Sequence, residues 1–177
     1  MIAYKGFVTV EKNDEKEIVR KANAVAFLFV DFERRVVLLI SQQREPMIRR
    51  SNPRGIIIEV PAGTRDLKVG IKGLVVKEAL EEIGKRIIPK QVKLLNQGVP
   101  LAVSPGWTTE RIYLAYVETD LRSCMKKTSR VFGLKSHGER IKRRTVSFDE
   151  LEQMTFADMK TFAIVQWFLK QIRTRRK

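Results

Sequence analysis

Residues 73–84 read GLVVKEALEEIG, and this stretch decides the fold because its apolar residues recur at helical spacing. Gly84 is typical of a helix C-terminus, where a residue in the left-handed conformation ends the hydrogen-bonded ladder. We therefore predict a helix over 73–84 that packs one apolar face against a hydrophobic core. That face would consist of Val76, Ala79, Leu80 and Ile83.

The polar side of this helix carries three glutamates, Glu78, Glu81 and Glu82. Residues three or four apart are neighbours on a helix surface, so these carboxylates would repel one another unless a cation lay among them. Hard oxygen ligands of this kind suit Mg²⁺ or Mn²⁺, and Mg²⁺ is commonly shared between carboxylates and substrate phosphates. From the glutamates alone, a solvated acidic face softened by Lys77 and Lys85 is the alternative.

Short β-rich runs lie on both sides of the helix. Residues 24–30, AVAFLFV, are typical of a buried strand, and 36–40 would pair with them as a hairpin. The polar stretches 42–54 and 121–138 are predicted as loops. This order of elements favours an α+β fold or an αβα sandwich over a doubly wound sheet. Further strands are predicted at 4–10, 17–21, 55–60, 92–97, 112–117 and 141–147, and helices at the capping-box sequence from Ser147 and over 155–172.

The length of 177 residues suits one domain with a full hydrophobic core. We expect N-terminal strands within 1–22, a core over 23–172 and a basic tail at 173–177. No apolar run approaches the length needed to span a bilayer, and the N-terminus shows no signal-like apolar stretch. The single cysteine, Cys124, excludes an internal disulfide. These features predict a cytoplasmic protein.

The charge is unusual, because 35 basic residues outnumber 20 acidic ones and give a net charge of +15. Basic residues are densest at Arg49 and Arg50, over 126–144 and in the tail. A solvated basic surface is the favoured interpretation. Attraction of a phosphate-bearing substrate and weak, non-specific binding of nucleic acid are the functional alternatives.

The sequence around the acidic helix resembles the Nudix box, G-x5-E-x7-R-E-U-x-E-E-x-G-U, in which U is a bulky apolar residue. The spacing matches throughout, and the matching positions are Gly63, Glu78, Glu81, Glu82 and Gly84. The chain departs from the pattern at Val69, Lys77 and Lys85, which stand where the family has Glu, Arg and an apolar residue. In the family the first glutamate and the arginine brace the loop against the helix. Because both differ here, we expect another contact in place of that brace, with metal binding retained.

Four further segments resemble the Nudix subfamily of ADP-ribose pyrophosphatases and nucleoside diphosphate sugar hydrolases. They are QQR at 42–44, EVPAG at 59–63, SPGWTTE at 104–110 and DMKT at 158–161. With the box, these segments follow one another in the family's order over about residues 24–169. The resemblance implies an αβα sandwich with a mixed sheet, on which the box forms a loop-helix-loop motif.

The resemblance also implies a pyrophosphohydrolase that cleaves the diphosphate of a nucleoside diphosphate sugar such as ADP-ribose or GDP-mannose. The cofactor would be Mg²⁺ or Mn²⁺, held by Glu78, Glu81, Glu82 and the carbonyl oxygen of Ala62. Glu82 thereby counts among the catalytic residues. A carboxylate outside the box would act as general base, for which Glu139 is the first choice and Glu110 the second.

Three residues are expected to contact the substrate. Arg44 would bind the diphosphate or ribose, since a guanidinium binds phosphate oxygens in bidentate fashion. Glu59 would bind substrate hydroxyls or the base. Trp107 would stack on base or sugar, and burial in the core is its alternative. Members of the subfamily are usually homodimers that exchange N-terminal strands, so we expect a homodimer, with neither a membrane nor a nucleic acid as partner.

Two rival functions stay open. A Nudix enzyme acting on capped RNA or dinucleoside polyphosphates would suit the basic surface. A non-catalytic, nucleotide-binding Nudix domain would suit the departures at Val69 and Lys77, although three mutually repelling glutamates have no purpose in an idle site. His137 is the only histidine, which argues against a histidine-based triad or zinc site.

Overall fold

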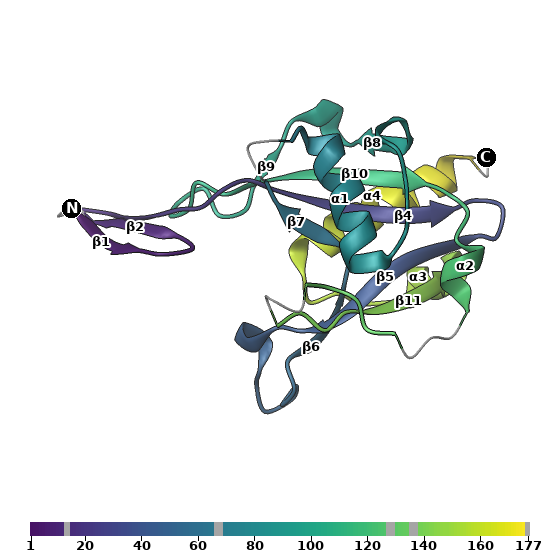
Figure 1. Cartoon of the computed structure of the whole chain (residues 1–177), viewed down its shortest axis with the longest axis horizontal. Helices are drawn as coiled ribbons and strands as arrows, with labels where there is room; N and C mark the ends of the chain where they lie inside the picture. Colours follow the sequence, from purple (N-terminus) through teal and green to yellow (C-terminus); the bar gives the residue numbers. More distant parts are fainter. Residues whose placement is uncertain (13–14, 66–68, 127–129, 135–137, 176–177) are drawn as a thin grey trace.

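A mixed β-sheet forms the centre of the body (Figure 1). The computed structural model of the chain describes residues 1–12, 15–65, 69–126, 130–134 and 138–175. Five strands follow one another across the sheet in the order β11-β5-β4-β10-β8, and β6, β7 and β9 pair with β5, β4 and β10. β10 runs parallel to β4, whereas the other pairs are antiparallel. The strands are β4 (Ala24–Asp31), β5 (Val36–Gln43), β6 (Ile56–Glu59), β7 (Ala62–Thr64), β8 (Val92–Leu94), β9 (Leu101–Ala102), β10 (Arg111–Glu118) and β11 (Lys142–Ser147).

Helices cover both faces of this sheet. α1 (Ile71–Ile83) packs on one face, and α4 (Met159–Arg175) packs on the other beside the short α3 (Phe148–Gln153) (Figure 1). Every residue of β4 is buried, and its side chains alternate between the two core layers, Val25 and Phe27 on the α1 side and Ala26 and Leu28 on the α4 side. Burial on both faces explains the continuous apolar run. The predicted α+β sandwich with a mixed sheet is confirmed.

The helix of the acidic motif begins at Ile71, two residues before the predicted start, and ends at Ile83. Gly84 follows with φ 68°, and the backbone N–H groups of Gly84 and Lys85 bond back to Leu80 and Ala79, as predicted for this stop. The apolar face differs from the prediction. Leu80 is 51% exposed, and the buried residues are Leu74, Val75, Ala79, Glu82 and Ile83.

Glu82 therefore lies on the buried side of α1 and not opposite it, with only 4% of its surface exposed. Val75, Ala79 and Glu82 are spaced i, i+4, i+7 and so lie along one stripe of the helix. The spacing of the apolar residues did not predict the burial of Glu82, because the stripe of α1 that packs on the sheet includes this carboxylate.

The N-terminal residues form a separate three-stranded sheet that projects from the body as an arm (Figure 1). Its strands are β1 (Ile2–Lys5), β2 (Thr9–Lys12) and β3 (Glu17–Arg20). The single strand predicted over 4–10 is wrong, because the chain turns there and the N–H of Gly6 donates to the carbonyl oxygen of Val8 at 2.9 Å. Val19 joins the arm to the body through backbone bonds to Trp107 (2.7 Å) and Thr109 (3.0 Å).

Other boundaries differ for local reasons. The Oγ of Ser147 accepts from the N–H of Glu150, which confirms the predicted start of α3. α4 begins four residues later than predicted, because the Oδ2 of Asp158 accepts from the N–H of Thr161 and so caps the helix. A short helix, α2 (Arg122–Met125), lies in the segment predicted as a loop. Three 3-10 turns were not predicted, η1 (Glu45–Met47), η2 (Pro89–Gln91) and η3 (Asn96–Gly98). No helix in the described ranges combines the length and apolar character needed to cross a bilayer.

Candidate active site

A cleft of about 670 Å³ opens beside α1, between β6–β7, the start of α4 and the loop that precedes β11. Elements far apart in the sequence bring their side chains together in it. Nearly all of the residues singled out from the sequence line this one cleft, namely Arg44, Glu59, Ala62, Glu78, Glu81, Glu82, Glu110 and Glu139. The fold thus joins the acidic motif to residues from all four flanking segments.

Trp107 is the exception, since it does not line the cleft and is 56% exposed. The alternative that it is a core tryptophan is wrong. It lies on the loop that joins the arm to the body, where its carbonyl oxygen accepts from the N–H of Val19. Its stacking on a base or sugar stays a prediction.

The backbone of β7 lies against the glutamates of α1. A Cβ atom on Gly63 would overlap the carboxyl group of Glu78, so only glycine leaves room for that side chain. One residue before Gly63, the N–H of Ala62 donates a hydrogen bond to the Oε2 of Glu82 at 3.2 Å. The predicted glycine of the motif is therefore needed for close approach of strand and helix.

The carboxylates in the cleft repel one another. Burial, together with repulsion from Glu81 and Glu139, raises the pKa of Glu78 to about 7, and Lys77 opposes this rise. Burial, with repulsion from Glu78 and Glu139, raises the pKa of Glu82 well above its ordinary value. In the described ranges, none of these four glutamates forms an ion pair. The site therefore concentrates negative charge that its own side chains leave uncompensated.

Glu139 reaches the cleft on a tightly closed loop. Phe132 and Ile141 exchange two backbone hydrogen bonds at the base of the loop, and the N–H of Gly133 donates to the carbonyl oxygen of Glu81 at 3.2 Å. The N–H of Leu134 then donates to the Oε2 of Glu139 at 2.9 Å. These contacts tie the loop to the end of α1. His137 lies outside the described residues.

Glu110 is in a different electrostatic setting. Its Oε1 lies 2.6 Å from the Nζ of Lys21, and only 12% of its side chain is exposed. Because Lys21 follows β3, this ion pair joins the arm to the wall of the cleft. Glu110 is thus compensated by a cation, whereas Glu139 is held by a backbone N–H.

Glu59 is fully buried at the end of β6, and three donors converge on it. Its Oε1 accepts from the Nε2 of Gln42 (2.9 Å) and the Nε of Arg44 (2.8 Å), and its Oε2 accepts from the Nζ of Lys160 (2.6 Å). Lys160 also lies 2.8 Å from the Oδ1 of Asp158. Glu59 therefore fixes two cationic side chains at the cleft, which it also lines, and its predicted contact with the substrate stays a prediction.

Sequence reasoning assigned no role to Lys160, Asp158 or Gln42. The signal was present, because the DMKT and QQR segments supply all three, but no local pattern links them to Glu59. Lys160 and Glu59 are 101 residues apart in the chain. The Oγ1 of Thr161 accepts from the N–H of Val60 at 2.9 Å and closes the same junction between β6 and α4.

Among the residues that the structure describes, no ion pair replaces the expected brace between loop and helix. Val69 is exposed, and Lys77 lines the cleft without an ion pair to any residue that the structure describes. Residues 66–68, which precede Val69, lie outside the described ranges.

The donor set suits a divalent cation shared with a phosphate-bearing ligand. Over the described ranges, no group of three or more carboxylate, histidine or cysteine side chains is arranged to hold a metal ion by itself. Mg²⁺ commonly takes one or two protein carboxylates and completes its shell with water and substrate phosphates. Glu78, partly buried, and Glu82, fully buried, repel each other beside a strand that only Gly63 allows to approach, and they fit that partial role.

A comparison with known proteins finds a similar enzyme. The chain is 35% identical over 109 residues to the GDP-mannose pyrophosphatase of Cronobacter sakazakii. The alignment covers 60% of this chain and 52% of that protein, so the chain spans about half the length of the curated relative it matches. No model of a known protein family matches the chain.

Proposed function

We propose that this chain is a divalent-metal-dependent pyrophosphohydrolase of the Nudix type that cleaves the diphosphate of nucleoside diphosphate sugars. The observation that carries the proposal is a pair of carboxylates without ion pairs among the described residues, the partly buried Glu78 and the buried Glu82, in a cleft that Arg44 and Lys160 also line. Such a cleft has ligands for a cation and donors for the anion that the cation accompanies.

Glu78, Glu81, Glu82 and the carbonyl oxygen of Ala62 would hold Mg²⁺ or Mn²⁺. The bound ion would neutralise the diphosphate and lower the pKa of a coordinated water. The protein's part is to keep Glu82 fixed by the N–H of Ala62, at 3.2 Å, and to keep Glu78 against Gly63. This fixed geometry spares the site reorganisation during the reaction.

Glu139 is our choice of general base, and Glu110 stays the alternative. A base must be ionised and free to take a proton from water. Glu139 faces the carboxylates of α1 and forms no ion pair with a described residue, whereas Glu110 is engaged by Lys21 at 2.6 Å. Of these two glutamates, Glu139 is therefore the better base, because its Oε1 makes no hydrogen bond to the described part of the chain.

Arg44 and Lys160, which line the same cleft as the proposed metal ligands, would bind the diphosphate. Arg44 uses its Nε to bond Glu59, which leaves both terminal nitrogens of the guanidinium for a phosphate. Lys160 has one N–H left after its bonds to Glu59 and Asp158. Glu59 would hold both donors in place.

The substrate class rests on the similarity to a GDP-mannose pyrophosphatase and on the flanking segments. The reaction would release a nucleoside monophosphate and a sugar phosphate. We further propose a homodimer, because the arm exposes Phe7 and yet Phe7 also lines the cleft. An arm so placed would be covered by a second copy of the chain, and sedimentation analysis measures whether the particle has twice the chain's mass.

One assay tests the proposed activity. The protein is incubated with Mg²⁺ and separately with GDP-mannose, ADP-ribose, UDP-glucose, diadenosine polyphosphates and capped RNA, and the products are identified. We expect turnover of a sugar nucleotide that Glu82→Gln abolishes while the thermal melting of the variant stays normal. Turnover of capped RNA or dinucleoside polyphosphates alone would favour that rival. No turnover of any compound by folded protein would favour a binding domain.

A further inference from the structure

The excess of positive charge lies outside the cleft. Among the described residues, seven acidic and four basic side chains line the cleft. Seven is about a third of the chain's 20 acidic residues, whereas four is only about a ninth of its 35 basic residues. The cleft chemistry therefore leaves the net charge of +15 unexplained, and the outer surface carries all of it.

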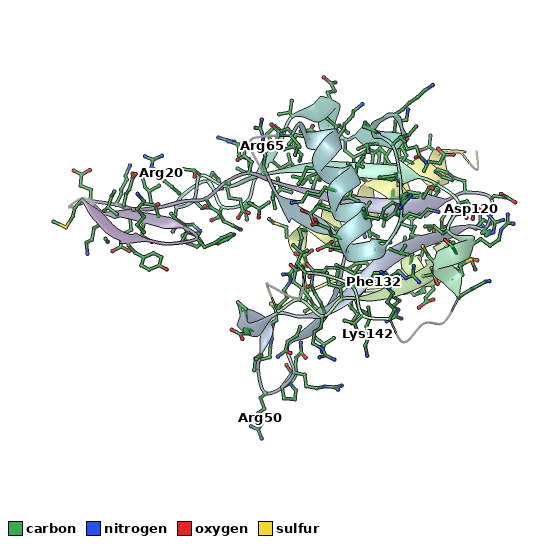
Figure 2. The ribbon with its side chains drawn as sticks, viewed as in Figure 1. Arg20, Arg50, Arg65, Asp120, Phe132 and Lys142 are labelled. Atoms are coloured by element: carbon green, nitrogen blue, oxygen red, sulfur yellow. The ribbon has the colours of Figure 1, made fainter. Side chains whose placement is uncertain are left out.

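One basic segment adjoins the cleft directly. The loop between β5 and β6, residues 44–55, is here called the arginine loop. Its first residue, Arg44, lines the cleft, as do Met47 within it and Ile57 just after it. The loop then extends away from the body, and Figure 2 shows Arg50 at its far end. A polymeric ligand that leaves the cleft on this side would run along the loop.

The arginine loop is ordered by its own backbone. Arg49 and Asn52 exchange two backbone hydrogen bonds, at 2.8 and 3.2 Å, and the side chain of Asn52 bonds both backbone groups of Ile56. Gly55 has φ 59°, and a Cβ there would meet the carbonyl oxygen of Arg44 at 2.5 Å. The loop is thus pre-formed, which lowers the entropy lost when it binds a partner.

Three arginines of this loop lack counter-ions. Arg49, Arg50 and Arg54 are exposed, and none pairs with a carboxylate in the described ranges. Arg49 makes only a 3.9 Å contact with the sulfur of Met47. Arginine at a surface is usually paired or scattered, whereas these three lie within six residues of one another on a rigid support. Guanidinium groups so held are suited to a row of phosphates.

We propose that the arginine loop binds the phosphate backbone of a single-stranded nucleic acid. A lipid surface fits less well, because the tip at residues 50–53 reads RSNP and the large apolar surface that the loop exposes is confined to Ile48, which is 50% exposed. A second copy of the chain fits less well, because two-fold pairing would place like charges together. This inference goes beyond the proposed function and does not require turnover of any substrate.

The test measures binding of a fluorescent oligouridine to the full chain by anisotropy, over a range of salt concentrations. Each phosphate contact on a single strand adds about −0.7 to the slope of log K against log salt, so loss of three contacts makes the slope shallower by about 2. Between about 50 and 200 mM salt, the wild-type affinity should then fall roughly twenty-fold more than that of the variant. The variant is Arg49→Ala with Arg50→Ala and Arg54→Ala.

The control variant removes the same charge elsewhere. Arg86, Lys90 and Lys93 are exposed, and they lie at and before β8, which is at the opposite end of the body from β6 (Figure 1). Replacing these three by alanine should leave the slope close to that of the wild type. Thermal melting curves check that both triple variants are folded, independently of any enzymatic activity.

Three results would overturn the proposal. The first is no oligouridine binding by the wild type at the lowest salt concentration of the series, about 50 mM, where phosphate contacts are strongest. The second is a salt-dependence slope that becomes equally shallow in both triple variants, because the binding would then depend on net charge and not on the arginine loop. The third is loop-dependent binding to vesicles of phosphatidylglycerol and phosphatidylcholine without binding to oligouridine, which would assign the loop to a membrane surface.

Discussion

Replacing Glu78 by glutamine should make the metal-free protein more stable at pH 8. In the native state burial and repulsion from Glu81 raise the pKa of Glu78 from 4.5 to about 7, so the folded chain binds a proton there more tightly than the unfolded chain. Stability from this group is fully present below pH 4.5 and is lost as the pH rises through about 7. Glutamine has the same shape and no charge to lose.

The magnitude follows from the pKa. Each unit corresponds to about 1.4 kcal/mol, so ionising Glu78 in the folded protein costs on the order of 3 kcal/mol. Glu78 is only partly buried, and solvent screening reduces this to about 1–2 kcal/mol. For a chain of this size the melting temperature should rise by about 3–6 °C.

The assay is thermal unfolding in EDTA at pH 5 and pH 8, followed by addition of Mg²⁺. We expect the stabilisation by Glu78→Gln to be large at pH 8 and small at pH 5. Mg²⁺ should raise the melting temperature of the wild type and have little effect on the variant. Glu118→Gln, an exposed position on β10, is the control and should behave as the wild type in both conditions.

A Glu78→Gln protein that melts below the wild type at pH 8 in EDTA would refute this reasoning. It would mean that Glu78 makes a favourable contact in the folded chain and that the glutamates of α1 are not held in mutual repulsion.

The other predictions concern the base, the strand next to α1 and the core. Glu139→Gln should lower kcat by about 10²–10⁴-fold, and by more than Glu110→Gln does, in steady-state assays with the sugar nucleotide that the wild type turns over; the opposite order would assign the base to Glu110. Gly63→Ala should weaken Mg²⁺ binding by about tenfold or more, because the new Cβ displaces the carboxyl group of Glu78, and calorimetric titration measures this. Asp31→Asn should cost about 2–3 kcal/mol in urea unfolding, because Asp31 is buried and accepts from the N–H groups of Leu121 (2.9 Å) and Arg34 (3.0 Å). Burial acts to raise the pKa of Asp31, but these bonds lower it below 3.8, so the difference between Asp31→Asn and wild type should hold at neutral pH and disappear as the pH falls below about 3.8.

Local pattern was enough to locate the main elements. The apolar run of β4 and the periodic residues of α1 predicted a buried strand and a helix at nearly their observed bounds. Both patterns reflect contacts within a few residues, which sequence spacing encodes directly. The same spacing placed Glu78, Glu81 and Glu82 together, since they lie on successive turns of one helix.

Local pattern failed where a residue's role depends on a distant partner. Leu80 was assigned to the core and is exposed, whereas Glu82 is buried against β7. The short strands β7 and β9 were missed, because two or three residues give no period to detect. The arm was given too long a strand, since its turn at Gly6 contains neither an Asn-Gly nor a Pro signal.

The sequence alone determined that three carboxylates lie on neighbouring turns of one helix and that an apolar strand runs through the centre of the fold. Only the tertiary structure decided that Glu139 approaches those carboxylates and that Glu59 is buried between Arg44 and Lys160. The physical reason is the distance along the chain between the residues in contact. Helical periodicity fixes neighbours through the backbone, whereas contacts between distant elements, such as the 2.6 Å bond across 101 residues from Lys160 of α4 to Glu59 of β6, exist only once the chain has folded around the sheet.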